Sequence, residues 1–286
     1  MNVNDDRTRL PITVNGNYVL DFNQKTFIMG ILNATPDSFS DGGRYNNTDR
    51  AIEHAMSMVR DGADIIDIGG ESTRPGFVEV AVEEEISRVV PIISAVASSV
   101  KVPISIDTYK AEVAKQAIEA GAHIINDIWG AKADPNMAKV ASQYQVPIIL
   151  MHNRNNKDYD DLIDDMIEDL TESIEIVKAA GVPDRKIILD PGIGFAKTFE
   201  DNIKVLQNLE KFKKLGFPVL LGTSRKGFIG QVMDLPPNER GEGTGATTCI
   251  GIQKGCDIVR VHDVLLNARL AKMTDVLVGK GGALHR

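Results

Sequence analysis

Short runs of aliphatic and β-branched residues recur along this chain, and this repeat most constrains its fold. The eight runs are TFIMGILN (26–33), DIIDIGG (64–70), PISID (103–107), HIIND (123–127), VPIILMH (146–152), KIILDP (186–191), PVLLGT (218–223) and DIVRVHD (257–263). Each is mostly apolar rather than strictly alternating, as in strands of a parallel sheet that is buried on both faces. Helical patterns lie between them, for example at 51–62, 111–121 and 160–181.

Glycine ends many of these helical patterns a few residues before the next strand. The five glycines are Gly62, Gly121, Gly181, Gly216 and Gly255. A glycine there can adopt the left-handed conformation that terminates a helix. Eight β units separated by helices predict a (β/α)8 TIM barrel forming a single domain over residues 1–286. The alternative is a doubly wound open sheet, but no Gly-x-Gly-x-x-Gly follows the first strand.

An N-terminal extension, residues 1–25, contains ITVNGNYVL (12–20), with Asn15-Gly16 between alternating apolar residues. This pattern predicts a β-hairpin. Its position before the first barrel strand indicates that it closes the bottom of the barrel.

Composition excludes several functions. The net charge of −8 argues against general binding to nucleic acid or an anionic membrane. The two cysteines are too few for a disulfide framework or a four-cysteine zinc site, and reduced thiols in the cytoplasm are expected. The start MNVNDDRTRL lacks the pattern of a signal peptide, and no apolar stretch has membrane-spanning length.

Polar residues collect where the predicted strands end, which is the active-site end of such barrels. Asp127, Ser224 and Asp263 are expected to be caps, and His152 a packed or hydrogen-bonded histidine. Considered by itself, Asp107 could be a cap of the next helix. Capping does not explain the presence of all four residues Asp107, Asn126, Asp190 and Lys226 at the strand ends. We expect these four to bind a polar ring system with several N–H donors; a buried structural ion-pair network is the alternative.

Two long loops and a local excess of basic groups predict an anionic ligand. The loops are residues 34–47 and 71–80, and loops of this length in a compact barrel are usually functional or disordered. Arg74, Arg260 and His262 supply positive charge. The helix start at SRKGFIG (224–230) presents further N–H groups, so a phosphate-bearing ligand is indicated.

Seven motifs, in this order, resemble those of the dihydropteroate synthase family, in its Gram-positive bacterial form. They are MGILNATPDSFSDGG (29–43), DIIDIGGESTRPG (64–76), ISIDTYK (104–110), INDIWG (125–130), ILDPGIGF (188–195), LGTSRKGFIG (221–230) and VRVHDV (259–264). The resemblance implies a TIM-barrel transferase of folate biosynthesis, the target of sulfonamides, that is usually a homodimer. The implied reaction joins 6-hydroxymethyl-7,8-dihydropterin pyrophosphate to para-aminobenzoate, giving 7,8-dihydropteroate and pyrophosphate, with Mg2+ as cofactor.

The resemblance also implies roles for individual residues. Asp107, Lys226 and Arg260 would be catalytic, with Asp107 stabilising the positive charge that develops on the pterin as pyrophosphate leaves. The implied pterin-binding residues are Asp107, Asn126, Met151, Asp190, Phe195, Gly222, Lys226 and Arg260. The implied pyrophosphate-binding residues are Asn33, Arg74, Arg260 and His262, with Asn33 beside the magnesium.

The implied pocket for para-aminobenzoate and sulfonamides consists of Phe39, Thr73, Arg74, Pro75, Lys226 and Gly227. The family often has a small polar residue at position 227. Glycine here removes a possible hydroxyl contact to the aminobenzoate carboxylate, although the backbone N–H remains.

Three other functions compete with this interpretation. A pterin-binding, corrinoid-linked methyltransferase would share the barrel and the pterin carboxylates but would lack the ATPDSFSDGG and STRPG loops. A Schiff-base aldolase would need a lysine with a depressed pKa, whereas Lys226 is expected to face aspartates that favour its charge. A catalytically inactive pterin-binding protein is disfavoured by the presence of Asn33, Asp107, Lys226 and Arg260.

Overall fold

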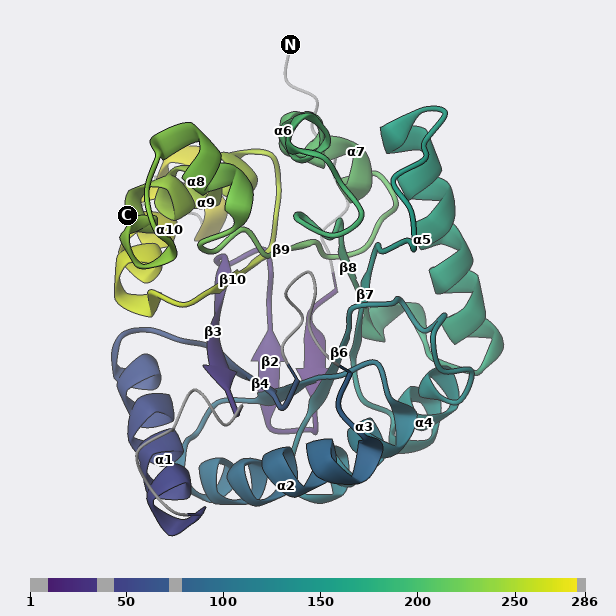
Figure 1. Ribbon diagram of the computed structural model, residues 1–286, viewed down its shortest axis with the longest axis vertical. Helices are drawn as coiled ribbons and strands as arrows, with labels where there is room; N and C mark the ends of the chain where they lie inside the picture. The colour runs from purple at the N-terminus through teal and green to yellow at the C-terminus, as the bar shows by residue number, and fades with distance from the viewer. Residues whose placement is uncertain (1–9, 35–43, 72–78, 282–286) are drawn as a thin grey trace.

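The computed structural model describes residues 10–34, 44–71 and 79–281, which form a barrel of eight parallel strands surrounded by helices (Figure 1). The strands are β3 (Phe27–Asn33), β4 (Ile65–Gly69), β5 (Ile104–Asp107), β6 (Ile124–Asp127), β7 (Ile148–Met151), β8 (Ile187–Asp190), β9 (Leu220–Leu221) and β10 (Ile258–Val261). All eight coincide with the predicted runs, so the expected strand positions are confirmed.

The strand order shows that the sheet is a closed barrel. Hydrogen bonding runs in the order β8-β7-β6-β5-β4-β3-β10-β9, and a parallel bridge between Leu189 and Val219 joins the two outer strands. Every neighbouring pair in this sheet is parallel. The (β/α)8 fold is therefore confirmed, and the open doubly wound sheet is excluded.

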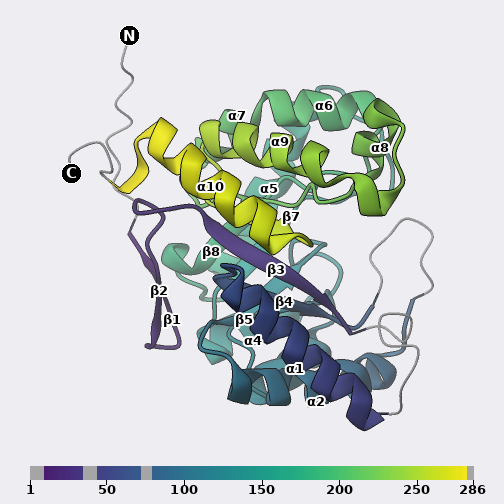
Figure 2. The same ribbon diagram turned by 90° about the vertical axis from the view of Figure 1, so that its left-hand side faces the viewer.

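A two-stranded hairpin precedes the barrel, as predicted. Strands β1 (Ile12–Val14) and β2 (Tyr18–Leu20) pair antiparallel. Asn15 and Gly16 both have positive φ, 47° and 69°, as the tight turn between such strands requires. The hairpin lies at the end of the barrel away from the carboxyl ends of the strands (Figure 2).

The hairpin closes the bottom of the barrel with apolar side chains. These side chains form one buried cluster with the inward-facing residues of the strands: Ile12, Val14, Leu20, Phe22, Phe27, Met29, Ile65, Ile124, Ile149, Ile188, Leu220 and Ile258. Burial of so much apolar surface is the main stabilising contribution at this end. The lower half of the interior is therefore packed, and only the upper end is available for a site.

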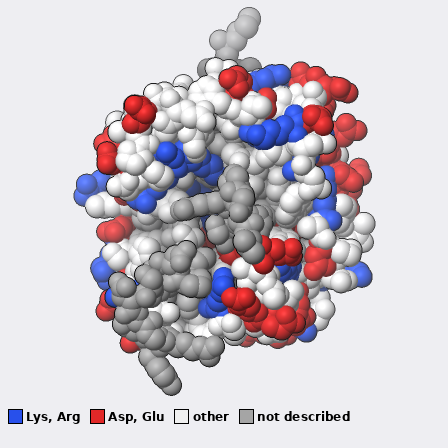
Figure 3. Space-filling view, in the orientation of Figure 1, with Lys and Arg blue, Asp and Glu red and all other residues white. Residues whose placement is uncertain are grey.

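The open end of the barrel faces the viewer in Figures 1 and 3. Lys and Arg side chains as well as Asp and Glu side chains lie around the middle of this face (Figure 3). Both signs of charge therefore gather around the barrel mouth, although the chain is acidic as a whole.

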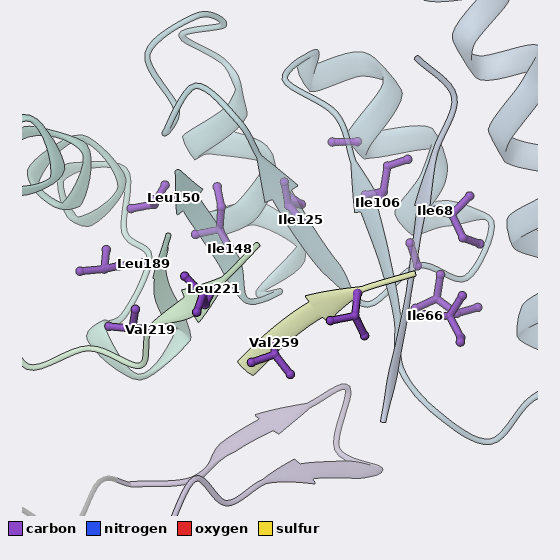
Figure 4. Packing of buried hydrophobic residues seen from close by; sticks show 14 of the residues in the cluster. Ile66, Ile68, Ile106, Ile125, Ile148, Leu150, Leu189, Val219, Leu221 and Val259 are labelled. Atoms are coloured by element: carbon purple, nitrogen blue, oxygen red, sulfur yellow. The ribbon is translucent and has the colours of Figure 1, made fainter. Parts of the chain in front are cut away.

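Helices cover the outside of the barrel and bury the outward-facing strand residues. The α-helices are α1 (Arg44–Arg60), α2 (Val82–Ser99), α3 (Ala111–Glu119), α4 (Met137–Tyr144), α5 (Leu162–Ala179), α6 (Phe199–Gln207), α7 (Leu209–Lys213), α8 (Gly227–Met233), α9 (Gly241–Gln253) and α10 (Val264–Val278). The described residues also include the short 3-10 helices η2 (Asp184–Lys186) and η3 (Pro237–Glu239). Figure 4 shows outward-facing side chains such as Ile66, Ile106, Leu150 and Val259 within this second apolar cluster.

The five glycines expected to end helices all adopt positive φ. Their φ values lie between 89° for Gly216 and 117° for Gly121. The prediction that these glycines adopt the left-handed conformation is therefore confirmed, and glycine is favoured there because a side chain would strain the backbone.

Helix α10 packs one face on the barrel and leaves the other exposed. Val264, Asn267 and Ala271 are buried, whereas Met273 and Leu277 are 57% and 71% exposed. No helix in the described part of the chain is long and apolar enough to cross a membrane.

Candidate active site

Polar side chains line the upper half of the barrel interior. Side chains alternate between the two faces of a strand, so Asp67 points inward two residues after the inward Ile65, and Asn126 two residues after Ile124. The same alternation turns Asp107, Asp190 and Arg260 inward. The sequence therefore brings five strands together into one polar layer above the apolar plug, at the end where barrel enzymes bind substrates.

Arg260 is the centre of this layer. Its Nε lies 2.6 Å from Oδ2 of Asp67, and its Nη2 lies 2.6 Å from Oδ2 of Asp107. The Arg260 side chain is 21% exposed and that of Asp67 fully buried. An ion-pair network is therefore present, but it joins Arg260 to Asp67 and Asp107. Of the four residues for which such a network was the alternative, it includes only Asp107. However, it leaves Oδ1 of the buried Asp107 without a hydrogen-bond partner among the described residues.

Asp107 does not cap the helix that follows it. The N-cap of α3 is Lys110, which makes no side-chain capping bond. The carboxylate of Asp107 instead points into the barrel mouth toward Arg260. The capping explanation of the carboxylate at the end of this apolar strand is thus wrong.

Asp67 is a site residue that sequence reasoning missed. Its Oδ2 accepts hydrogen bonds from Nε of Arg260 and, at 3.2 Å, from Nδ2 of Asn126. The rule that barrel sites form where strands end does not select Asp67, because it lies in the middle of β4. The available signal was a charged residue within an otherwise apolar run, at an inward position by period-two counting.

Asp190 and Lys226 approach the layer from the other side. Oδ1 of Asp190 accepts from the backbone N–H of Gly192 at 2.7 Å, and Oδ2 lies near Gly222, at 3.8 Å from the ideal Cβ position. Met151, which pairs with Asp190 in the sheet, is buried beside it. Lys226 donates to the carbonyl of Ile193.

Phe195 lies next to Lys226. The Lys226 Nζ is 4.4 Å from the centre of the Phe195 ring. The loop after β8 and the start of α8 therefore meet at the barrel mouth. Every predicted pterin-binding residue lies at this end of the barrel.

Burial changes the protonation of these groups. It raises the pKa of Asp107 to about 7, against the opposing charge of Arg260, and Asp67 raises it further. Burial also raises the pKa of Asp190, while Gly192 N–H and Lys226 oppose the shift. Burial lowers the pKa of Lys226 to about 8, although the Asp190 carboxylate favours its charged form. The expectation that neighbouring aspartates would prevent a depressed pKa at Lys226 is therefore wrong. The pKa values of Asp107 and Lys226 are therefore both shifted towards neutral pH.

His262 and Asn33 lie at the rim of the barrel, at the carboxyl ends of the neighbouring strands β10 and β3. His262 follows β10, and its Nδ1 lies 2.9 Å from Oγ of Ser224. Ser224 Oγ also accepts from the backbone N–H of His262 at 3.1 Å. The prediction that Ser224 caps a helix is therefore wrong, because the N-cap of α8 is Lys226. Ser224 instead orients His262.

Asn33 ends β3 with an exposed side chain that offers one amide oxygen. Among the described residues no group of three or more His, Cys, Asp or Glu side chains could hold a metal ion. Mg2+ often takes only one or two protein oxygens and completes its shell with phosphate and water. Asn33 suits this kind of site and does not suit an all-protein cage.

Of the other two expected helix caps, Asp263 is confirmed and Asp127 is wrong, because a turn follows Asp127 and the next helix, α4, has Asn136 as its N-cap. The expected packed histidine is confirmed. Asp263 caps α10 by accepting from Leu266 N–H. Asp127 faces outward and accepts from the backbone of Trp129 and Ala131. His152 is buried and its Nε2 lies 3.0 Å from Asp169.

Four predicted residues, namely Phe39, Thr73, Arg74 and Pro75, lie outside the described residues. Gly227, the remaining predicted aminobenzoate contact, is exposed at the first turn of α8.

Comparisons with known proteins agree with this geometry. Residues 29–262 match the family model described as "Pterin binding enzyme". The chain is 62% identical to the dihydropteroate synthase of Bacillus subtilis over 266 residues, covering 93% of each chain. It is 52% identical to that of Synechocystis, covering 92% of this chain and 93% of that protein.

Solved structures give the same result. A Clostridium difficile dihydropteroate synthase, crystallised in the presence of pteroic acid, superposes with a TM-score of 0.88 at 52% identity, covering 90% of this chain and 98% of that one. A Xanthomonas albilineans dihydropteroate synthase with 4-aminobenzoic acid gives 0.89 at 37% identity, covering 94% and 98%. With this similarity along nearly its whole length, and with the polar barrel mouth described above, the chain belongs to the dihydropteroate synthase family and is a transferase with that activity.

Proposed function

We propose that the barrel mouth condenses 6-hydroxymethyl-7,8-dihydropterin pyrophosphate with para-aminobenzoate, with Asp107, Lys226 and Arg260 as the catalytic residues. The observation that carries this assignment is the inward carboxylate of Asp107. One of its oxygens is fixed by Arg260, and the other has no partner among the described residues. A buried acceptor of this kind is expected to receive a hydrogen bond from a ligand.

The pterin ring fits the chemistry of the remaining groups. Its amino and ring N–H groups are donors, which suits the carboxylates of Asp107 and Asp190 and the amide of Asn126. Its carbonyl oxygen suits the ammonium of Lys226. Met151, Phe195 and Gly222 complete the proposed contacts with the ring faces and edges. The Clostridium difficile relative was crystallised in the presence of pteroic acid, which contains the same ring system.

In the proposed reaction the bond between the pterin methylene carbon and the pyrophosphate oxygen breaks, and the electron pair leaves with pyrophosphate. Positive charge then develops on the methylene and the conjugated ring. The ionised carboxylate of Asp107 stabilises this charge more in the transition state than in the ground state. The aryl amine of para-aminobenzoate supplies the electron pair for the new C–N bond and afterwards loses its proton to water. No general base is needed before the attack, because the amine is already neutral.

Arg260, His262, Asn33 and Arg74 are the proposed pyrophosphate-binding residues. Arg260 lies between the pterin carboxylates and this rim, so it can contact both the ring and the leaving group. Mg2+ is the proposed cofactor, with Asn33 as its protein ligand; when bound, it would stabilise negative charge on the departing pyrophosphate. Asn33 offers a single side-chain oxygen, and one protein ligand of this kind is consistent with a metal ion that is bound mainly by the pyrophosphate.

The proposed aminobenzoate pocket consists of Phe39, Thr73, Arg74, Pro75, Lys226 and Gly227. The structure of the Xanthomonas albilineans relative was solved with 4-aminobenzoic acid, and that of the Yersinia pestis relative with a sulfonamide drug complex. Lys226 and Gly227 at the start of α8 are the two described members of this set.

We also propose that the enzyme is a homodimer formed from one domain per chain, acting in the cytoplasm. Met273 and Leu277 of α10 and Ile250 of α9 are exposed on helices that pack together. Exposed apolar side chains on two neighbouring helices suit an interface between copies. Neither Cys249 nor Cys256 forms a disulfide among the described residues, as is usual in that compartment.

The test is to mix the purified protein with the dihydropterin pyrophosphate, para-aminobenzoate and Mg2+, and to follow dihydropteroate and pyrophosphate together. Equal formation of both, abolished by EDTA and restored by excess Mg2+, is expected. Pterin binding without product would retain the pocket but overturn the assignment of the catalytic residues. It would favour the corrinoid-linked methyltransferase, which the same preparation would reveal by methyl transfer from a methylated pterin.

A further inference from the structure

The loop that follows β8, residues 191–198, contains a buried lysine to which the mechanism assigns no role. Lys197 is only 5% exposed. Its Nζ lies 3.0 Å from the carbonyl oxygen of Gly192, 2.9 Å from that of Phe195 and 3.0 Å from Nδ1 of His152. One side chain therefore ties the two ends of the loop to each other and to the residue after β7.

The hydrogen-bond pattern requires Lys197 to be an ammonium. His152 Nε2 lies 3.0 Å from Asp169 Oδ2, an oxygen that also accepts from Arg154 Nε. A carboxylate only accepts, so Nε2 carries the imidazole hydrogen and Nδ1 accepts from Lys197. The three acceptors around Lys197 then use all three N–H groups of an ammonium. Burial lowers the pKa of His152 to about 3, which keeps its ring neutral. Burial also lowers the pKa of Lys197 to about 7, so the ammonium that makes all three hydrogen bonds prevails below that pH.

The same loop carries the contacts of Lys226. Lys226 donates to the carbonyl of Ile193, and its Nζ lies 4.4 Å from the centre of the Phe195 ring. The loop backbone is also packed against the lysine stem: a Cβ at Gly194 would lie 2.8 Å from Cδ of Lys226. Both the carbonyl and the ring lie between Gly192 and Lys197, in the stretch that Lys197 closes.

We infer that Lys197 is a positioning residue for the pterin site, because its ammonium fixes the loop that sets the places of Lys226 and Phe195. The inference rests on the proposed function, in which Lys226 and Phe195 contact the pterin. It assigns to Lys197 and His152 a role in binding one substrate and no contact with it.

A purely structural lysine would stabilise the fold without acting through Lys226. Lys280 at the opposite end of the barrel provides a matched control. Its Nζ lies 3.0 Å from Oγ1 of Thr26 and 3.2 Å from the carbonyl oxygen of Cys256, and burial lowers its pKa as well. Lys197→Met and Lys280→Met thus each remove a lysine that ties backbone together.

The experiment measures the Kd of 6-hydroxymethylpterin by its fluorescence, together with thermal melting, for Lys197→Met, Lys226→Met, the double variant and Lys280→Met. We expect Lys197→Met to raise Kd by about tenfold, the equivalent of one well-made polar contact. Lys280→Met should lower the melting temperature and leave Kd unchanged. The double variant should bind only as weakly as Lys226→Met, since Lys197 acts through Lys226 and the loop.

Two results would overturn the inference: an unchanged Kd in Lys197→Met, or losses in the two single variants that simply add in the double variant. An unchanged Kd in Lys226→Met would instead refute the proposed pterin site itself, so the two failures can be told apart. If Lys197→Met does not fold, Lys197→Gln, whose amide can still donate to one carbonyl, replaces it in the same cycle.

Discussion

Oδ2 of Asp67 lies 2.6 Å from Nε of Arg260, a residue 193 positions later in the chain. The same oxygen accepts from Nδ2 of Asn126. One carboxylate oxygen on β4 therefore orients side chains from β10 and β6, both of which are proposed to contact the pterin. Such a shared acceptor fixes two substrate-binding groups relative to each other before the substrate arrives.

Asp67→Asn is expected to lower kcat/KM for the dihydropterin pyrophosphate by about ten- to a hundredfold, since Arg260 loses a buried charged partner. The KM for para-aminobenzoate should change little, because Asp67 lies beneath the proposed pterin site. Steady-state kinetics with each substrate varied in turn will show this. The control is Asp64→Asn, which weakens an ion pair with Lys25 at the bottom of the barrel. Equal losses in both variants would mean that Asp67 acts only through stability.

The pH dependence should reveal the state of Asp107. Burial raises its pKa to about 7, and the mechanism needs the ionised form. The value of kcat/KM should therefore fall as pH decreases through about 7. Asp107→Asn should lose about a hundredfold or more in kcat and lose this acidic limb. A profile from pH 5 to 9 for both proteins tests this, and an unchanged limb in the variant would assign it to another group.

The same shift has a consequence for stability. A carboxyl whose pKa is raised in the folded state favours folding below its unfolded pKa, and this contribution is lost as pH rises through about 7. Melting temperatures of Asp107→Asn should accordingly depend less on pH between 4 and 7 than those of the unchanged protein.

Lys110 joins the two sides of the loop that carries Thr73, Arg74 and Pro75. Its Nζ binds Glu71, which precedes residues 72–78, and lies 2.7 Å from the carbonyl oxygen of Val80, which follows them. It also lies 2.7 Å from Oε2 of the buried Glu85. The ammonium of Lys110 therefore balances the negative charges of two buried carboxylates, those of Glu71 and Glu85.

Lys110→Met should lower the free energy of unfolding by about 3–5 kcal/mol, because it leaves buried carboxylates unpaired. In the folded fraction, KM for para-aminobenzoate should rise while pterin affinity is retained. Denaturant unfolding and substrate kinetics measure the two effects. Lys115→Met, which breaks an exposed pair with Glu112 on α3, should change neither. A larger loss on the pterin side would contradict the proposed division of the site.

Features of the fold and the site could be predicted from the sequence where they depend on residues close together in the chain, and not where they depend on residues far apart. The hairpin at Asn15-Gly16 and the eight strands depend on local patterns, which can be read directly. The rim residues Asp107 and Asp190 followed from the rule that barrel sites form where strands end. Asp67 was missed and Ser224 misread, because their partners Arg260 and His262 are distant in sequence. Pairings of this kind depend on sheet register and barrel closure, which no single segment specifies.

Gly227 offers a specific test of the aminobenzoate pocket. It begins α8 and is exposed. Apart from its chain neighbours and the backbone of its own helix, no atom of the described residues lies within 4 Å of the position of an added Cβ. Its φ does not lie in the left-handed region, so a side chain can be added without strain. A serine there would place a hydroxyl at the helix start, next to Lys226.

Gly227→Ser should lower KM for para-aminobenzoate by about threefold to tenfold, the effect of one additional hydrogen bond to its carboxylate. Gly227→Ala is the control, because replacing glycine also restricts the unfolded chain and can stabilise the protein by about 0.4–1 kcal/mol. The pterin Kd should be the same in all three proteins, since the change lies on the aminobenzoate side of Lys226. If serine and alanine gave the same KM, the hydroxyl would make no contact with the substrate, and the aminobenzoate carboxylate would have to be bound elsewhere.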